Sequence, residues 1–501
     1  MSIFNIQTKN QRKIMEIRPN VKFLSDYIIP QILTEAMDIL CGLGVTIYDD
    51  DLLGVLGDHG ASINPPTHHV IFTCDMIEKA LRTVPSSFKL FDAVGNETHH
   101  FSGYNVYFTP ASSALNILDP DTSGMRPPTT EDYIRYVQVT AQLEHVMAQS
   151  TAFVPSDVDE TISDSYRLYL NLMYGEKPVV TGTFNESAFE IMKEMQLAVR
   201  GSEAELKDKP LTIFSCCPTT PLKWNKSICR DIISCGKAGI PVELISMPLT
   251  GFTGPVSLTG SLIGHTAETL SGIVISQLTN PGSPLLYGGA SAAFDMRHGT
   301  TLLGALESQM MNCATNEIGK FLGIPTQSYI ALSDAKVLDA QAGLETAMGA
   351  VLGALSGINS ISGPGMLDFV NCFSIEKLIL DNELCGMIYR MLKGIEPRED
   401  FPALDIYREL IREQHLLASA HTMKYFKKEH YFPGKVIDRM NRSKWEESGS
   451  LTLNERAQAE VRQLLKTHKP SSLKSEVKKQ LTEIMQSEAR RAGMDRLPAR
   501  L

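Results

Sequence analysis

Residues 284–312 read PLLYGGASAAFDMRHGTTLLGALESQMMN, which is a strand, a loop and a helix in that order. The run PLLYG from Pro284 is apolar and has the length of a buried strand. The loop Gly288–Thr301 is rich in small and polar residues, and a helical pattern follows from Glu307 to Phe321. A strand, a loop and a helix form the repeating unit of a parallel α/β fold.

The same unit recurs along the middle of the chain, at intervals of roughly 30–40 residues. The other strand-like runs are NVYFT from Asn105, HVMAQ from His145, PVVTG from Pro178, LTIFS from Leu211, PVELIS from Pro241, TQSYIA from Thr326 and INSIS from Ile358. Helical patterns separate them, as at Glu131–Leu143, Glu186–Val199, Thr266–Leu278 and Leu344–Leu355. Eight alternations without a hairpin signal favour a parallel sheet, and eight is the number that closes a barrel. We predict an α/β protein with a (β/α)₈ TIM barrel over residues 101–395.

The two flanks have a different pattern. Residues 1–100 are expected to form a helical N-terminal extension, in which Ile29–Leu43 is amphipathic. Residues 396–501 are charged and helical, and end in the amphipathic SLKSEVKKQLTEIMQSEARRAG from Ser472. We expect this C-terminal helical extension to pack on the barrel or on a neighbouring subunit, or to dock a partner.

Composition excludes several classes of protein. The formal charge of −10, from 47 Lys+Arg and 57 Asp+Glu, argues against non-specific nucleic-acid binding. The N-terminal MSIFNIQTKNQRK has no apolar signal core, and no run of ~18 apolar residues follows it. The nine cysteines are odd in number, and no two have C-x-x-C spacing. We therefore expect a cytoplasmic protein that binds neither nucleic acid nor a membrane.

The ends of the predicted strands should carry the chemistry, because a barrel places its reactive groups there. These positions are rich in hydroxyl, aromatic and small residues and poor in charge. Glycines among them would let a bulky planar ligand approach the backbone, and the candidates are Gly288, Gly289, Gly363 and Gly365. Asp334, in the segment SDAKVLDAQAG after the seventh strand, is a further candidate for substrate binding, and it can also pair with Lys336.

Charge is concentrated in the loop after the sixth strand. Arg297 and His298 could bind a substrate carboxylate, because the guanidinium offers a fixed fork of donors. The alternative is that Asp295 and Arg297 pair locally to hold the loop, and that His298 is a structural hydrogen-bonding residue. Glu307 would orient the pair, or simply start the next helix.

Cys216 and Cys217 raise the question of zinc. Thiolates that bind zinc at a barrel mouth would indicate a thiol or methanol methyltransferase. Neighbours on a strand point to opposite faces, however, and no further Cys or His has a suitable spacing. No metal site is predicted.

Three segments identify a resemblance. The chain resembles the trimethylamine methyltransferase family in AFDMRHGTTLLGALESQMMN, in SDAKVLDAQAGLETAMGAVLGALSGINSISGPGMLDF, and in HT at His421 with NRSKWEESGS around Trp445. The likeness spans most of the chain. Archaeal trimethylamine enzymes of this family carry pyrrolysine near the loop after the seventh strand, whereas this chain has only standard residues. The resemblance is therefore to the branch without pyrrolysine.

The resemblance implies a barrel that acts with a separate corrinoid protein, whose cobalamin-type cofactor docks over the barrel mouth. It implies a methyl donor such as glycine betaine, carnitine, γ-butyrobetaine or proline betaine, and a homo-oligomer. Aromatic faces would hold the quaternary nitrogen, and the candidates are Phe108, Phe184, Tyr287, Phe294, Tyr329 and Phe369. Arg297 and His298 would meet a betaine carboxylate. No residue is assigned a catalytic role.

Two other functions remain open on the sequence. One is the zinc-dependent methyltransferase, which stoichiometric zinc in the purified protein would favour. The other is a non-catalytic protein that binds betaines on the same scaffold, which methyl transfer to Co(I)alamin would exclude.

Overall fold

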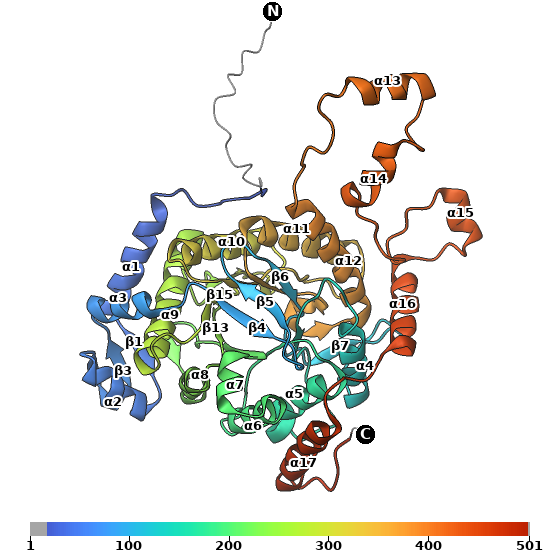
Figure 1. Ribbon diagram of the computed structural model, residues 1–501. Helices are drawn as coiled ribbons and strands as arrows, with labels where there is room; N and C mark the ends of the chain where they lie inside the picture. The colour runs from blue at the N-terminus through green and yellow to red at the C-terminus, as the bar shows by residue number, and fades with distance from the viewer. Residues whose placement is uncertain (1–17, 499–501) are drawn as a thin grey trace, which may run out of the picture.

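Eight short strands and the helices between them form the centre of the computed structural model, which describes residues 18–498 (Figure 1). The N-terminal MSIFNIQTKNQRK thus lies outside the described residues. The strands are β6 (Tyr107–Thr109), β9 (Gln149–Ser150), β10 (Val179–Thr181), β11 (Thr212–Cys216), β13 (Val242–Ser246), β15 (Leu285–Gly289), β18 (Gln327–Tyr329) and β19 (Ser360–Ser362). Each one overlaps one of the eight runs expected from the sequence, so the α/β class is confirmed.

All eight strands pair in parallel. Five form a sheet in the order β15-β13-β11-β10-β9, and three form a sheet in the order β18-β19-β6. Two isolated parallel bridges connect these sheets, Phe108 with Val146 before β9 and Tyr287 with Thr326 before β18.

Helices connect consecutive strands, one more helix follows the last strand, and all of them pack outside the strands (Figure 1). They are α4 (Thr130–Thr140), α5 (Ser163–Tyr174), α6 (Ala188–Arg200), α7 (Glu203–Asp208), α8 (Lys226–Ala238), α9 (Leu258–Thr279), α10 (Leu306–Phe321), α11 (Ala340–Ser356) and α12 (Ile375–Leu392). Local sequence fixes where they begin. Thr129 and Asp132 form a capping box at α4, and the Asp339 carboxylate accepts the Gln341 and Ala342 N–H groups at α11.

The N-terminal region contains strands as well as helices, which corrects the expectation of a helical extension. Its helices are α1 (Ile28–Gly42), α2 (Asp50–Asp58) and α3 (Cys74–Thr83). Strands β1 (Val45–Ile47), β2 (Ser62–Asn64) and β3 (His69–Ile71) form a small sheet with β12 (Lys223–Trp224), and β4 (Phe88–Phe91) pairs with β5 (Glu97–Phe101). Runs of three to five residues are too short to show a period in the sequence.

The β4–β5 hairpin lies at the centre of the view in Figure 1. Its Leu90 and Phe101 are buried in one apolar cluster with Val180, Ile213 and Leu286, which come from three of the parallel strands. The hairpin thus buries apolar side chains of β10, β11 and β15.

The C-terminal extension has two parts. Helix α16 (Leu453–Thr467) packs on α4 and α12, and α17 (Ser475–Arg491) packs on α5 and α6 through buried residues that include Leu481 and Met485. Helices α13 (Leu404–Glu413), α14 (Ala420–Glu429) and α15 (Arg442–Glu447) lie away from the strands (Figure 1).

Short strands also form in the loops that follow the parallel strands. One sheet contains β7 (Asn116–Leu118), β8 (Met125–Arg126), β20 (Met366–Leu367) and β21 (Cys372–Phe373), and another contains β14 (Leu249–Thr250), β16 (Ala292–Asp295) and β17 (Thr300–Leu302). Within residues 18–498 no helix is long and apolar enough to cross a membrane.

Candidate active site

A cavity of about 430 Å³ lies where the parallel strands end. Its lining comes from the ends of six parallel strands or the loops after them, from the first turn of α8, and from the turn before β21. The lining residues are Ser112, Ser113, Gly182, Thr183, Phe184, Ser215, Cys217, Ile228, Ile245, Met247, Ala290, Leu303, Tyr329, Phe369 and Val370. Parallel strands bring their carboxyl ends together, which is why residues so distant in sequence share one cavity. It is lined mainly by apolar groups, with a few hydroxyls.

Three of the six predicted aromatic residues line this cavity: Phe184, Tyr329 and Phe369. The Tyr329 hydroxyl lies 3.0 Å from the Ser112 hydroxyl, and burial raises its pKa. Phe184 is 68% exposed, so its ring is available to a ligand. Together they supply the π faces that a quaternary cation requires.

Phe369 is held by an unusual backbone. Asp368, Phe369 and Val370 have φ values of 50°, 58° and 68°, so three consecutive residues other than glycine are left-handed. Each costs about 1–2 kcal/mol relative to the right-handed form. Lys336 Nζ lies 3.7 Å from the centroid of the Phe369 ring and 3.5 Å from Asp368. Strain of this kind is typical of ligand-binding segments.

Glu243 of β13 is a site residue that the sequence analysis missed. Its side chain is buried behind the cavity lining, and Ser215 Oγ donates to Oε1 at 2.6 Å. The other oxygen, Oε2, is buried without a hydrogen-bond partner among the described residues. Burial raises the pKa of this carboxyl to about 7, although the bond from Ser215 opposes the shift. A single acid in the apolar run PVELIS was the signal available in the sequence.

A second carboxyl group lies beside the cavity. The hydroxyl of Thr183, which lines the cavity, donates a short hydrogen bond to Asp231 of α8. Burial raises the pKa of Asp231 to about 7; the charge of Asp164 acts in the same direction, and the Thr183 bond opposes it.

Arg167 of α5 stabilises the positions of two lining residues, Ser113 and Phe184. Its guanidinium is buried, pairs with Asp164 at 2.7 Å, and donates to Ser113 Oγ at 3.1 Å. Asp164 in turn accepts the backbone N–H of Phe184 at 2.6 Å, and the Phe184 ring lies 5.5 Å from the guanidinium carbon. The position of Phe184 therefore depends on this buried ion pair.

Two predicted aromatic residues lie elsewhere, which corrects their assignment to the cavity wall. Phe108 is buried against Tyr389 of α12, with ring centroids 5.6 Å apart. Tyr287 is buried beside α9, and its hydroxyl donates to Thr266 Oγ1 at 3.2 Å. Both point toward the helices, because alternate residues of a strand face opposite sides.

The residues predicted to bind a carboxylate are outside the cavity lining. Arg297 and His298 lie in the turn between β16 and β17, with side chains 82% and 69% exposed. Both bond to Asp295, at 2.7 Å and 3.2 Å, so the local pairing considered for Asp295 and Arg297 is the one observed. These bonds hold the pKa of Asp295 well below its usual range. Phe294 stacks on Phe252 at 4.8 Å in the same region.

Glu307 and Asp334 are likewise outside the lining. Glu307 is exposed in the first turn of α10. Asp334 is buried and accepts the Gly304 N–H at 2.9 Å, and burial raises its pKa to about 7. Lys336 donates to the Asp334 backbone oxygen at 2.7 Å, while its charge pairs with Asp368.

The four predicted cofactor glycines are buried, and each has a close protein neighbour. A Cβ on Gly288 would lie 2.7 Å from Leu244 O, and one on Gly289 would lie 2.4 Å from His265 Nε2. Gly363 and Gly365 have φ values of +146° and +88°, and a Cβ there would meet Ala331 and Phe373. Packing alone accounts for these glycines, and their contact with a corrinoid stays a prediction.

The adjacent thiols do not share one environment. Cys216 is buried near Cys235, and Cys217 lines the cavity. Cys217 is exposed, and the surrounding protein together with the nearby Glu243 raises the pKa of its thiol. Within residues 18–498 no three His, Cys, Asp or Glu side chains are grouped so as to hold a metal ion.

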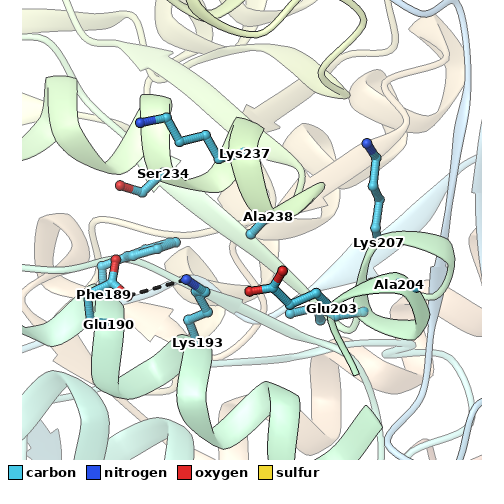
Figure 2. A pocket seen from close by; sticks show the side chains of 10 residues that line it. Phe189, Glu190, Lys193, Glu203, Ala204, Lys207, Ser234, Lys237 and Ala238 are labelled. Atoms are coloured by element: carbon cyan, nitrogen blue, oxygen red, sulfur yellow. Dashed lines mark hydrogen bonds and ion pairs between the residues drawn. The ribbon is translucent and has the colours of Figure 1, made fainter. Parts of the chain in front are cut away.

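Another hollow, of about 490 Å³, lies between α6, α7 and α8, and Figure 2 shows side chains that line it. Its lining includes three lysines and two glutamates, and Lys193 pairs with Glu190 at 3.4 Å. No strand end contributes to it. This hollow therefore belongs to the outer helices and is separate from the candidate site.

Comparisons with known proteins agree with this geometry. The family model of the trimethylamine methyltransferases matches residues 4–494. Among curated relatives, the trimethylamine methyltransferase MttB2 of Methanosarcina mazei is 35% identical, over 90% of this chain and 91% of the relative. The glycine betaine methyltransferase of Desulfitobacterium hafniense is 28% identical, over 95% of this chain and 99% of the relative.

A solved structure shows the same fold. The monomethylamine methyltransferase of Methanosarcina barkeri superposes with a TM-score of 0.51 at 13% identity, and 89% of each chain is covered. The family model extends over nearly the whole sequence, and the chain therefore belongs to the trimethylamine methyltransferase family.

Proposed function

We propose that the protein transfers a methyl group from a small quaternary amine to Co(I) of a corrinoid carried by a separate protein. The observation that carries this proposal is the cavity at the strand ends, where Phe184, Tyr329 and Phe369 provide aromatic faces and Glu243 is buried behind the wall. Each aromatic face contributes roughly 0.5–2 kcal/mol toward a bound cation. Family relatives that act on trimethylamine and on glycine betaine support the same reaction class.

A corrinoid on a partner protein requires an open and partly apolar face above the cavity. Exposed apolar side chains occur in several of the loops that follow the parallel strands, namely Leu115, Met125, Phe184, Phe252, Val256, Met296 and Leu306. This distribution fits a large planar group presented from outside, because extended exposed apolar surface is typical of a partner site. When bound, the corrinoid supplies a strongly nucleophilic Co(I).

The task of the chain is then to position the methyl donor. A quaternary nitrogen leaves as a neutral tertiary amine, so no proton moves and no general acid is needed. The aromatic faces hold the cation, and the hydroxyls of Ser112 and Tyr329 fix one side of the cavity. Holding the methyl group in line with the nucleophile lowers the entropic part of the barrier.

We propose further that the eight parallel strands form one closed (β/α)₈ barrel over residues 101–395. The two bridges between the sheets support this, because they pair β6 with the start of β9 and β15 with the start of β18. The flanking regions 1–100 and 396–501 then act as extensions of this single barrel.

We also propose a cytoplasmic homo-oligomer. All nine cysteines are free thiols, as expected in a reducing compartment. Helix α13 has no buried residue, and its Leu404, Tyr407 and Ile411 are exposed on one side of the helix. An apolar helix face of this kind favours burial against another subunit.

The test is an absorbance assay of methyl transfer to free Co(I)alamin. The donor panel contains glycine betaine, carnitine, γ-butyrobetaine, proline betaine, choline, tetramethylammonium and trimethylamine. Transfer from at least one quaternary amine is expected. If the folded protein transfers from none of them, also with its corrinoid partner present, the proposed reaction is wrong.

A further inference from the structure

The cavity has an electrostatic character that the family alone does not predict. None of its fifteen lining residues is Lys, Arg or His. Behind the lining lie the carboxyl groups of Glu243 and Asp231, and both are buried. Burial strengthens charge interactions, because the surroundings screen them less than water does.

Three cations on elements that adjoin this cavity are already neutralised. Arg167 is buried in its ion pair with Asp164, and its remaining hydrogen bonds go to Ser113 Oγ and to two backbone oxygens. Lys336, which lies over Phe369, pairs with Asp368. Arg297 is bound to Asp295 on the exposed hairpin. The ionisable groups that remain without a charged partner beside the cavity are therefore the carboxyls of Glu243 and Asp231, and a bound cation would favour their negative form.

The hydroxyl groups of the cavity do not compensate for the missing cation. The Ser215 hydroxyl donates to Glu243, and the Thr183 hydroxyl donates to Asp231. The hydroxyls of Ser112 and Tyr329 bond to each other, so one of their two hydrogens is used. Two of the five hydroxyls thus donate to carboxyl groups of the protein, and the others are neutral donors, so a ligand carboxylate would meet no charged donor in the lining.

We propose that this cavity is built for a quaternary ammonium compound whose remaining groups are uncharged, and that Glu243 provides its counter-charge. The inference rests on the proposed function and narrows its substrate class. In glycine betaine a single methylene separates the nitrogen from the carboxylate, so both charges would enter the same cavity. That carboxylate would lose water without gaining a cationic partner, which is unfavourable. Choline and tetramethylammonium bring only the positive charge, and Oε2 of Glu243 has no other partner among the described residues.

Calorimetric titration of the full-length protein tests this directly. The probes are choline, tetramethylammonium, glycine betaine and 3,3-dimethyl-1-butanol, which has the shape of choline without its charge. We expect choline and tetramethylammonium to bind at least tenfold more tightly than glycine betaine and the neutral alcohol. Glu243→Gln keeps the size and the acceptor for Ser215, and should weaken choline binding at least tenfold.

Glu190→Gln is the matched control, because Glu190 lies in the hollow of the outer helices, away from the cavity lining, and pairs with Lys193 (Figure 2). It should leave choline binding unchanged, and circular dichroism should show that both variants fold. Glycine betaine binding as tightly as choline would overturn the inference. So would a Glu243→Gln protein that binds choline within twofold of the wild type, or a folded wild type that binds none of the cations.

The methyl-transfer assay separates this inference from the reaction itself. Transfer from glycine betaine in preference to choline would refute the inference and leave the reaction standing. Transfer from no quaternary amine would refute the reaction, whatever the titrations show.

Discussion

Replacing Arg167 by methionine removes the buried guanidinium on which Phe184 and Ser113 depend. The side chains of Arg167 and Asp164 are each only 1% exposed, and their charged atoms are 2.7 Å apart. Methionine matches the apolar stem but leaves the Asp164 carboxylate with two backbone N–H donors, those of Phe184 and Asn185, and no positive charge. Breaking a buried pair in this way costs about 3–5 kcal/mol.

The assay is urea unfolding at 25 °C, followed by the fluorescence of the buried Trp224 and by circular dichroism. We expect the free energy of unfolding of Arg167→Met to fall by about 3–5 kcal/mol. Asp164→Asn combined with Arg167→Met removes the unpaired charge and should recover part of that loss. Arg82→Met is the matched control, because both side chains of the Arg82–Glu78 ion pair are exposed to solvent and its loss should not measurably move the midpoint.

Arg167→Met should also weaken ligand binding in the cavity. The Phe184 ring loses its contact with the guanidinium, so binding of a quaternary amine should weaken by about tenfold, which corresponds to roughly 1.4 kcal/mol. If Arg167→Met unfolds within 1 kcal/mol of the wild type, or if the double variant is no more stable than the single one, the buried pair does not hold this part of the site.

Three other substitutions test separate parts of the structure. Gly289→Ala should lower the free energy of unfolding by about 1–3 kcal/mol, because its Cβ would lie 2.4 Å from His265 Nε2. Adding His265→Ala should recover part of this loss in urea unfolding. If Gly289→Ala is as stable as the wild type, the close packing of Gly289 on His265 is refuted. Asp231→Asn should raise the melting temperature at pH 8 but not at pH 4. The pKa of Asp231 is about 7 in the folded protein and lower in the unfolded chain, so ionisation of Asp231 destabilises the folded state. This loss of stability is absent below about pH 4 and complete above about pH 7. A gain that is equal at both pH values would contradict that account. Ile411→Asp on α13 should lower the mass seen by sedimentation without lowering the melting temperature, and an unchanged mass would exclude this helix from the subunit contact.

Much of the architecture was predictable because it depends on local sequence. The eight strand runs and the helices between them were identified from apolar runs of strand length and from helical periodicity. The strands of the N-terminal region were missed. They are three to five residues long, and the β4–β5 hairpin is stabilised by contacts of Leu90 and Phe101 with β10, β11 and β15, which lie far away in the sequence.

The candidate site was predicted only in part. Phe184, Tyr329 and Phe369 line the cavity, whereas Phe108 and Tyr287 face the helices. The sequence showed that these aromatic residues lie near the ends of strands. It did not show which face of the strand each side chain occupies, because a shift of one residue along the strand exchanges the two faces.

The sequence by itself determined the alternation of strands and helices, the family, and the loops from which a site could be built. Only the tertiary structure decided which charges that site contains. In the folded chain Arg297 is exposed and pairs with Asp295, whereas Glu243 is buried behind the cavity wall. The residue type gives the charge that a side chain can carry. The effect of that charge on a ligand depends on burial and on the partner that neutralises it, and both arise only when distant segments pack together.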